Sequence, residues 1–449
     1  MIDSRWAILK CKFADDASGT PPDEIYERLF TGAGTGSFNM VDYFRDMSHG
    51  QLDLSRSQVF GWFTLSLRMT DFAGNVDNSA LRPGQVNRFG LFAACRSAAE
   101  SAGVPLSDFS GIVVSMNRGR PSAVGTDGVD LWGAAGGMAF CDRYSLMPSL
   151  LGQEMGHGYG LNHSRRAGSV MDYQDPWDTM STAAAYMQPH TEFTNIGPGL
   201  SAANMRSRGW LDEGRVWRAG PFDVDQIVRL RPLHRYTLSG FLTADIPDPE
   251  IPNGRWLLEF RNKQGWDGGV PTSAVLIHRL TGGYSYLVPG PIPGRDYLLA
   301  GDVIERGSAT DPNFSYYKIE VLAIDPTAET CDLRFTYRRG RDVSESLVAM
   351  VSGQMLGNIQ VDGAGLVIGP DGRIVPIGPW DPTAKILENV TALQAVERIE
   401  DTAARETAQR SIWLAIKDTA ESSLKRLNPT KTPFLKEDTL RYDGKEPVK

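Results

Sequence analysis

The sequence of 449 residues lacks several features that mark specialised classes of protein. No run of Lys or Arg forms a basic patch, and a formal charge of −8 argues against a general nucleic-acid binder. No apolar stretch is long enough to span a membrane, and Met1–Arg5 lacks the basic and apolar regions of a signal peptide. We expect no nucleic-acid partner and no membrane span. Three locations stay open: inside the cell, export without a cleaved signal, and an extracellular chain that has been trimmed.

Cysteine is scarce, whereas glycine and proline are abundant. The spacing of the four cysteines, Cys11, Cys95, Cys141 and Cys331, does not indicate a disulfide framework. One or two disulfide bonds among them are still compatible with the sequence. The 47 Gly and 27 Pro indicate many turns and therefore a loop-rich, strand-rich chain. The length exceeds one ordinary core, so we expect two or three domains.

The hydrophobic pattern changes along the chain and predicts four regions. Residues 1–215 mix strands and helices, and residues 216–340 show recurring strands between turns, which predicts a β-sandwich-like module. Residues 341–380 predict a β-hairpin connector, and residues 381–449 a helical segment with a mobile tail, whose helices are candidates for self-association. Within the first region we expect helices near 22–30, 39–47 and 85–102 and strands near 6–13, 51–59, 62–68 and 111–116.

The residues that carry chemistry are concentrated between Gln153 and His163. On a helix, Gln153 and His157 would lie one turn apart on one face and reach the same metal ion. Glu154 would project beside them and serve as general base toward water. Gly160 stands where the helix must end, often with positive φ, and the reversal would return His163 as a third ligand. Either histidine alone is more simply structural, but their joint placement with Glu154 and Gly160 favours a metal site.

This segment resembles the long zinc-binding signature of the metzincins, H-E-x-x-H-x-x-G-x-x-H. It matches at Glu154, His157, Gly160 and His163 and departs at Gln153. Segments 41–52, 173–181, 197–204 and 208–211 resemble parts of the gametolysin-like and immune inhibitor A-like peptidases. The resemblance covers about residues 5–340. It implies an α+β catalytic domain over residues 1–215, with a mixed twisted sheet and an active-site helix, a bound Zn²⁺ ion, and a protein or peptide substrate.

Two methionines compete for the turn that lies beneath the metal ligands in such enzymes. Met180, in Asp-Thr-Met-Ser, resembles the turn of gametolysin-like peptidases, whereas Met171 resembles that of astacin-like and matrixin-like enzymes. We favour Met180 because the flanking resemblances point to the same family. Tyr173 is a candidate for stabilising the oxyanion of the transition state, and a structural tyrosine is an equally good interpretation.

Gln153 leaves three interpretations open, because a carboxamide oxygen is a weaker zinc donor than an imidazole. In the first interpretation, Gln153 binds the metal through its side-chain oxygen, and another divalent ion such as Cu²⁺ is an alternative to Zn²⁺. In the second, a nearby group on the following segment replaces Gln153 as ligand, with three candidates: Asp175, Asp178 and His190. In the third, the fold is catalytically inactive and binds a protein or glycan partner. Glu154 beside two histidines favours a metal-dependent endopeptidase, with the strand near 134–140 as a substrate-pairing edge.

Overall fold

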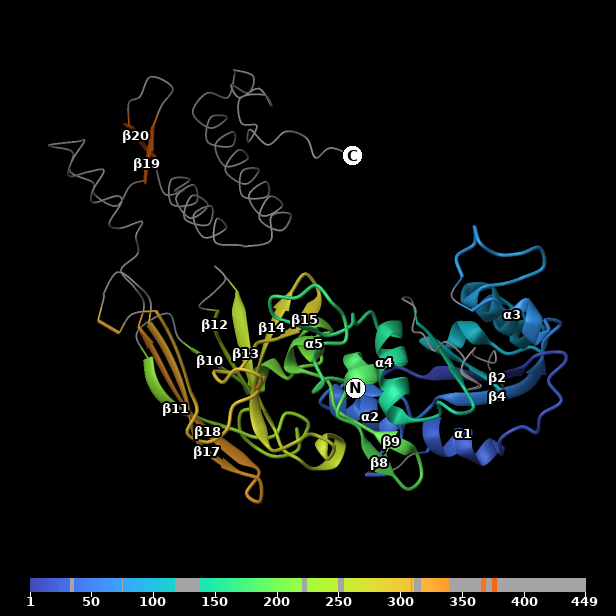
Figure 1. The fold of residues 1–449 in the computed structure, drawn as a ribbon, viewed down its shortest axis with the longest axis horizontal. Coiled ribbons are helices and arrows are strands. Elements are labelled where there is room, and N and C mark those ends of the chain that lie inside the picture. Colours follow the sequence, from blue (N-terminus) through green and yellow to red (C-terminus); the bar gives the residue numbers. More distant parts are fainter. Residues whose placement is uncertain are drawn as a thin grey trace. The chain divides into compact units, whose positions relative to one another are not determined.

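The structure is a computed structural model, and every structural statement below concerns the part of the chain that it describes. That part comprises residues 1–32, 36–74, 76–117, 137–219, 224–248, 254–307, 309–310, 316–338, 365–368 and 374–377. It is a mixed α/β protein with several sheets and few helices (Figure 1). Within these residues, no helix combines the length and the apolar character needed to cross a bilayer.

The chain divides into two compact units. The first contains Met1–Pro247, Gly254–Glu305 and Tyr317–Thr336; the second contains Asp248–Asn253, Arg306–Tyr316 and Tyr337–Lys449. In the second unit, β19 (Gly365–Ile368) and β20 (Ile374–Ile377) pair antiparallel within the segment expected to form a hairpin. The predicted turn between them and the predicted helical segment 381–449 lie outside the described residues.

The first unit begins with a four-stranded parallel sheet of order β4-β2-β5-β6. Its strands are β4 (Gln58–Thr64), β2 (Trp6–Lys12), β5 (Gly111–Met116) and β6 (Met138–Asp142). Strands β2 and β5 are buried almost throughout, as their continuous apolar runs require in a sheet that is covered on both faces. The strand expected near 111–116 is confirmed, and it lies inside the sheet between β2 and β6.

The expectation of two strands at 51–59 and 62–68 was wrong. Residues Leu52–Asp53 form the short strand β3, which pairs with β1 (Ile2–Asp3), and one strand, β4, crosses the expected break. Gly61 lies at the expected break between the two strands. In the structure it has φ +99°, and a Cβ there would lie 2.4 Å from the Lys10 carbonyl oxygen. Glycine therefore permits an irregularity in the β2–β4 register without ending the strand.

Helices cover both faces of this sheet, and the predicted helices near 22–30, 39–47 and 85–102 are confirmed. The first two are α1 (Asp23–Phe30) and α2 (Met40–Met47), and the third is α3 (Arg88–Ser101). The side chains of Asn39 and Asn87 cap α2 and α3 by accepting backbone N–H groups. Figure 1 shows β2 and β4 between α3 on one side and α1 on the other.

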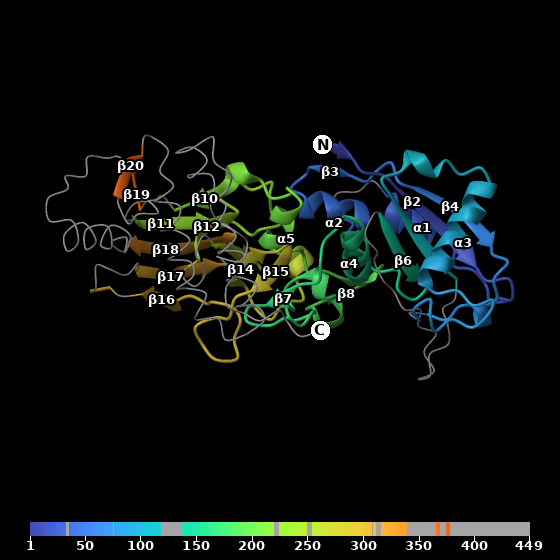
Figure 2. The same cartoon turned by 90° about the horizontal axis from the view of Figure 1, so that it is seen from above.

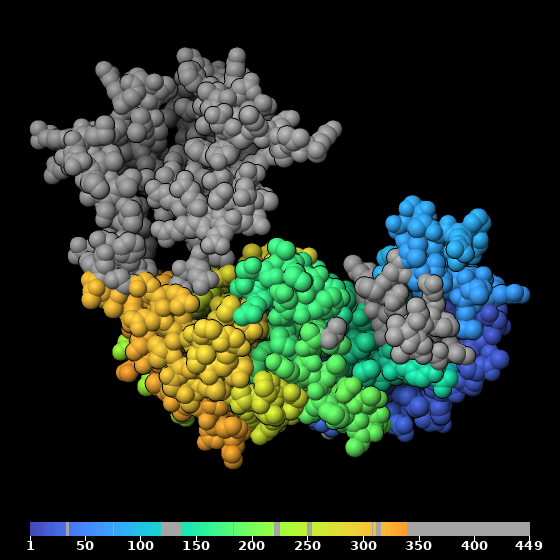
Figure 3. All heavy atoms as spheres, viewed as in Figure 1, coloured from blue at the N-terminus to red at the C-terminus, as the bar shows by residue number. Residues whose placement is uncertain are grey.

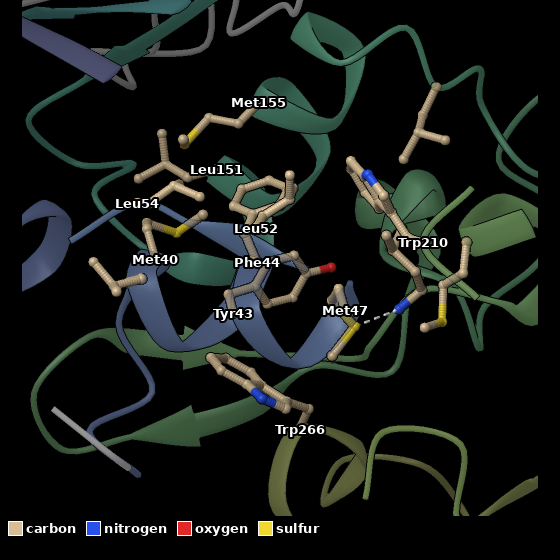
Figure 4. Packing of buried hydrophobic residues seen from close by; sticks show 14 of the residues in the cluster. Met40, Tyr43, Phe44, Met47, Leu52, Leu54, Leu151, Met155, Trp210 and Trp266 are labelled. Carbon is tan, nitrogen blue, oxygen red and sulfur yellow. Dashed lines mark hydrogen bonds between the residues drawn. The ribbon is translucent and has the colours of Figure 1, made fainter. Parts of the chain in front are cut away.

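Two hydrophobic clusters follow from the alternation along β2. Trp6 and Ile8 face α1, α2 and α4 (Pro148–Gly158), whereas Ala7 and Leu9 face the cluster that includes residues of α3. Figure 4 shows the first cluster, in which side chains of α2 pack together with those of α4 and with Trp210 and Trp266. This cluster therefore continues from the first sheet into residues that follow it in sequence.

The rest of the first unit contains two further sheets, of order β10-β12-β13-β14-β15-β7 and β11-β18-β17-β16. The six-stranded sheet consists of β10 (Val216–Arg218), β12 (Thr243–Pro247), β13 (Arg255–Arg261), β14 (Ala274–Thr281), β15 (Tyr284–Leu287) and β7 (Arg165–Arg166). The four-stranded sheet consists of β11 (Val224–Leu230), β18 (Thr330–Arg338), β17 (Tyr316–Asp325) and β16 (Val303–Gly307). The other elements are β8 (Gln188–His190), β9 (Thr194–Ile196), α5 (Ala202–Ser207) and the 3₁₀ helices η1 (Met69–Asp71), η2 (Leu106–Asp108), η3 (Thr179–Ala184), η4 (Glu213–Arg215) and η5 (Gly265–Asp267).

Strand β7 belongs to residues 1–215 in sequence but lies in a sheet whose other strands come after residue 215 (Figure 2). It pairs in parallel with β15 through Tyr286↔Arg165 and Leu287↔Arg166. After helix α4 and His163, the chain therefore forms strand β7 of the six-stranded sheet, whose other strands follow residue 215. This crossing decides which residues surround the candidate site.

Candidate metal site

Helix α4 carries the first half of the site. Pro148 occupies its first turn, where a missing N–H costs nothing, and the helix places Gln153 and His157 one turn apart. The helix is followed by Gly160 with φ +84°, and the Leu161 N–H donates to the Gly156 carbonyl at 3.0 Å. The expected reversal with positive φ at Gly160 is confirmed.

The reversal brings the two histidines together. The Nε2 atoms of His157 and His163 lie 2.9 Å apart. His157 Nδ1 lies 2.8 Å from the carbonyl oxygen of Leu161, and His163 Nδ1 lies 3.1 Å from Asp172 Oδ2. Each Nδ1 faces an acceptor and therefore carries the hydrogen in a neutral ring, which leaves a lone pair on each Nε2.

Two facing lone pairs at this distance repel each other unless a proton or a cation lies between them. Burial lowers the pKa of His157 to about 4, so a proton is a poor occupant of this position at neutral pH. Zn–N bonds of about 2.0–2.1 Å place two nitrogens bound to one ion about 3 Å apart. The geometry and the tautomers of the pair therefore fit two ligands of one divalent ion.

Tyr173 lies against the same pair. Its hydroxyl is 2.9 Å from His163 Nε2, and the ring centroids of Tyr173 and His163 are 4.1 Å apart. Its φ of +63° is rare for a bulky residue, and such strained conformations cluster at functional sites. Burial first, and then the charges of Glu154 and Asp172, raise the pKa of this tyrosine, so the hydroxyl keeps its proton and can donate it in a hydrogen bond.

Glu154 is buried close to this group. Its Oε1 accepts a long hydrogen bond of 3.3 Å from the Gln153 amide, and its Oε2 has no partner among the described residues. Burial raises the pKa of Glu154 to about 8, against a smaller opposing effect of the Gln153 hydrogen bond. A pKa near 8 keeps this carboxyl group largely protonated at neutral pH, and a cation beside it would favour the carboxylate form that a general base needs.

Gln153 is tied to a different neighbour. Its Oε1 accepts the backbone N–H of Thr182 at 2.9 Å, and its amide nitrogen donates to Glu154. These bonds connect α4 to η3 rather than to the histidines. A carbonyl oxygen has two lone pairs, so one remains for a second partner.

The two methionines lie in different surroundings. Met180 is fully buried in η3, and a Cβ on Gly156 would lie 2.7 Å from its Sδ, so the sulfur packs directly on the backbone of α4. Met171 is 64% exposed on the loop between His163 and Tyr173. Met180 is therefore the methionine that lies beneath the helix.

The other candidate ligands have partners elsewhere. Asp175 accepts from His278 and from the Trp177 N–H, and Asp178 accepts the N–H groups of Met180 and Ser201. The ring of His190 stacks on Phe193, and its Nδ1 accepts backbone N–H groups of its own loop. The structure thus brings together His157, His163 and Tyr173, with Glu154 nearby, and engages Asp175, Asp178 and His190 in other contacts.

Sequence reasoning missed a buried charge network behind the site. His278 on β14 lies between Asp175 and Glu259, and Arg261 on β13 pairs with Glu259 and Asp267; all are almost completely buried. Glu259 also accepts the N–H of Ala202, at the start of α5. Charged residues at positions 259, 261 and 278 inside otherwise apolar strands were the available signal.

In the described part of the chain, no three or more His, Cys, Asp or Glu side chains converge as a metal-binding group. A metal site here therefore depends on the two imidazoles together with oxygen donors such as Tyr173 Oη or Gln153 Oε1. Imidazole with neutral or phenolic oxygen suits Zn²⁺ or Cu²⁺.

Neither comparison with known proteins gives a family. No family model matches this chain, and no curated protein matches it significantly. The link to the metzincins therefore remains a resemblance carried by the residues named above.

Proposed function

We propose that this chain is a metal-dependent endopeptidase that binds Zn²⁺, or another divalent ion such as Cu²⁺, through His157 and His163. The observation that carries the proposal is the approach of the two Nε2 atoms to 2.9 Å, with an oxygen acceptor facing Nδ1 on the opposite side of each ring. Such an arrangement is costly without a cation and favourable with one. A bound ion supplies Lewis-acid polarisation of the scissile carbonyl and lowers the pKa of water.

The protein residues divide the remaining work. Glu154 takes a proton from the attacking water and returns it to the nitrogen of the leaving amine. The Tyr173 hydroxyl donates a hydrogen bond to the oxyanion that develops on the substrate carbonyl. Gln153 offers the second lone pair of its oxygen as a third donor, and Met180 supports α4 from below.

The proposal includes a fold assignment that goes beyond a mixed α/β chain. Helix α4, the glycine reversal at Gly160 and the buried Met180 support a metzincin-like, gametolysin-like catalytic domain. The described strands of its sheet all pair in parallel, where a mixed sheet was expected. The two sheets that follow support a β-sandwich-like module. Strand β6, at the edge of the described sheet, is the candidate for pairing with an extended protein or peptide substrate.

Metal analysis and a casein-type hydrolysis assay test the proposal together. We expect about one ion per wild-type chain and hydrolysis that a chelator abolishes. Glu154→Ala is expected to keep the ion and to lose activity by about 10²–10⁴-fold, the usual contribution of a general base. His190→Ala is the matched control and should change neither property. Activity that survives Glu154→Ala would refute this mechanism.

One observation favours a second candidate function, a catalytically inactive peptidase fold that binds a protein or glycan partner. The oxygen of Gln153 already satisfies a buried backbone N–H, so this residue has a structural role that needs no metal. This candidate expects no bound ion in the wild-type protein and no gain of hydrolysis in Gln153→His. A metal-loaded, active wild type excludes it.

A further inference from the structure

The hairpin β14–β15 is attached to the chain on both sides of His163. Before the histidine, Asn162 Nδ2 donates to the Gly283 carbonyl at 3.1 Å. After it, β7 pairs with β15, and the Ala167 N–H donates to the Leu287 carbonyl at 2.8 Å. In Figure 3 the green residues of the site segment and the yellow residues of this sheet lie against each other. The position of His163 therefore depends on a hairpin more than a hundred residues later in the sequence.

Within this attachment, Arg165 has a distinct role. Its Nε donates to Asp172 Oδ1 at 2.8 Å, while Asp172 Oδ2 accepts from His163 Nδ1 at 3.1 Å. One carboxylate thus connects the guanidinium to the histidine. The guanidinium carbon of Arg165 lies 3.7 Å from the ring centroid of Tyr284 on β15, a close cation–π contact.

We propose that Arg165 is a positioning residue for His163: held against Tyr284, it fixes the Asp172 carboxylate, which in turn fixes the tautomer and direction of the His163 ring toward a divalent ion. This inference rests on the proposed metal site. Carboxylates that orient a metal-bound histidine typically contribute about 10–100-fold in metal affinity. The planar guanidinium supplies the geometry, because it can stack on a ring and donate a directed hydrogen bond at once.

Arg166 provides a matched control on the same short strand. It pairs with Asp296 at 2.6 Å, and its side chain is 40% exposed, against 17% for Arg165. Successive side chains of a strand point to opposite faces. Replacing Arg166 therefore removes a comparable ion pair of β7 without touching the Asp172–His163 contact.

The test measures metal affinity rather than activity. Zinc dissociation constants of the full-length wild type, Arg165→Met, Arg165→Lys and Arg166→Met are obtained by competition with a chromophoric chelator, and the melting temperature of each metal-free protein is recorded. We expect Arg165→Met to weaken zinc binding about 10-fold or more. Arg166→Met should change it less than about 3-fold at a similar melting temperature, and Arg165→Lys should recover part of the loss, because an ammonium still reaches Asp172.

A double variant tests the route of the effect. If Arg165 acts through Asp172, Arg165→Met adds little to the loss caused by Asp172→Asn, because the two residues act as one unit. Equal zinc affinities of Arg165→Met and Arg166→Met would overturn the positioning role and leave the metal site standing. A wild-type protein that binds no zinc or copper would overturn the positioning role together with the proposed function.

Discussion

Replacing His278 with glutamine is expected to destabilise the first unit and to remove much of its sensitivity to alkaline pH. His278 Nε2 lies 2.8 Å from Asp175 Oδ2, and its Nδ1 lies 3.3 Å from Glu259 Oε2, with all three side chains fully buried. Burial alone would lower the pKa of this imidazole, but Glu259 and Asp175 outweigh burial and raise it to about 10. The ring is therefore charged at neutral pH.

The size of the effect follows from the charges that remain. Glutamine keeps a hydrogen-bond donor but no charge, so Asp175 loses its cation and Glu259 keeps only Arg261. Removing one partner of a buried ion pair typically costs about 3–5 kcal/mol. At about 2–4 °C per kcal/mol for large domains, the melting temperature should fall by roughly 6–20 °C.

The pH dependence has a defined sign. The folded-state pKa of His278, about 10, lies above the ordinary value of 6.5 for histidine, so its stabilising contribution is complete below pH 6.5 and is lost as pH rises through 10. The gap in unfolding free energy between wild type and His278→Gln should therefore narrow between pH 7 and 10. Each pH unit contributes at most about 1.4 kcal/mol.

Thermal unfolding followed by circular dichroism at pH 6.5, 8 and 9.5, with a chelator present, measures both effects. His190→Gln is the control, because the His190 ring stacks on Phe193 and accepts a backbone N–H of its own loop, and it contacts no buried carboxylate among the described residues. A His278→Gln protein as stable as wild type at pH 6.5, or a gap that stays constant up to pH 9.5, would refute the reasoning.

Two further predictions concern backbone conformation and thiol chemistry. Gly61→Ala should lower the melting temperature more than Gly209→Ala, because both glycines have positive φ but only at position 61 would a Cβ meet backbone, the Lys10 carbonyl oxygen. Equal decreases would contradict the packing argument. The four cysteines, at positions 11, 95, 141 and 331, are buried free thiols. A thiol reagent should therefore label them only after the protein unfolds, and rapid labelling of the native protein would refute this prediction.

The pattern of apolar residues along the sequence predicted several helices and strands of the fold. The apolar run of β5 and the periodicity of α3 predicted these elements because each pattern lies within consecutive residues. At Gly61 one strand continues where two were expected, and glycine can either weaken a strand or permit an irregular one. Which of the two occurs depends on the approach of Lys10 from another strand, which no local pattern records.

In the candidate site too, contacts between residues close in sequence were predictable, whereas contacts between distant residues were not. His157, Gly160 and His163 lie within seven consecutive positions, so helix geometry and a reversal at Gly160 predicted that the two histidines meet. The contacts of Arg165 with Tyr284 and of Asp175 with His278 join residues more than a hundred positions apart. These contacts depend on β7 entering a sheet formed by later strands, and a two-residue strand has no periodicity from which to predict it.

Gln153 has a structural role that its strength as a metal ligand does not reveal. From the sequence, glutamine in place of histidine was a loss of metal affinity. In the structure, its oxygen satisfies the buried N–H of Thr182, next to the Met180 turn beneath α4. A neutral imidazole at this position would bind zinc more strongly but would leave that N–H without an acceptor, at a cost of about 1–3 kcal/mol. At the proposed site, Gln153→His is therefore expected to raise the zinc affinity and to lower the melting temperature of the metal-free protein.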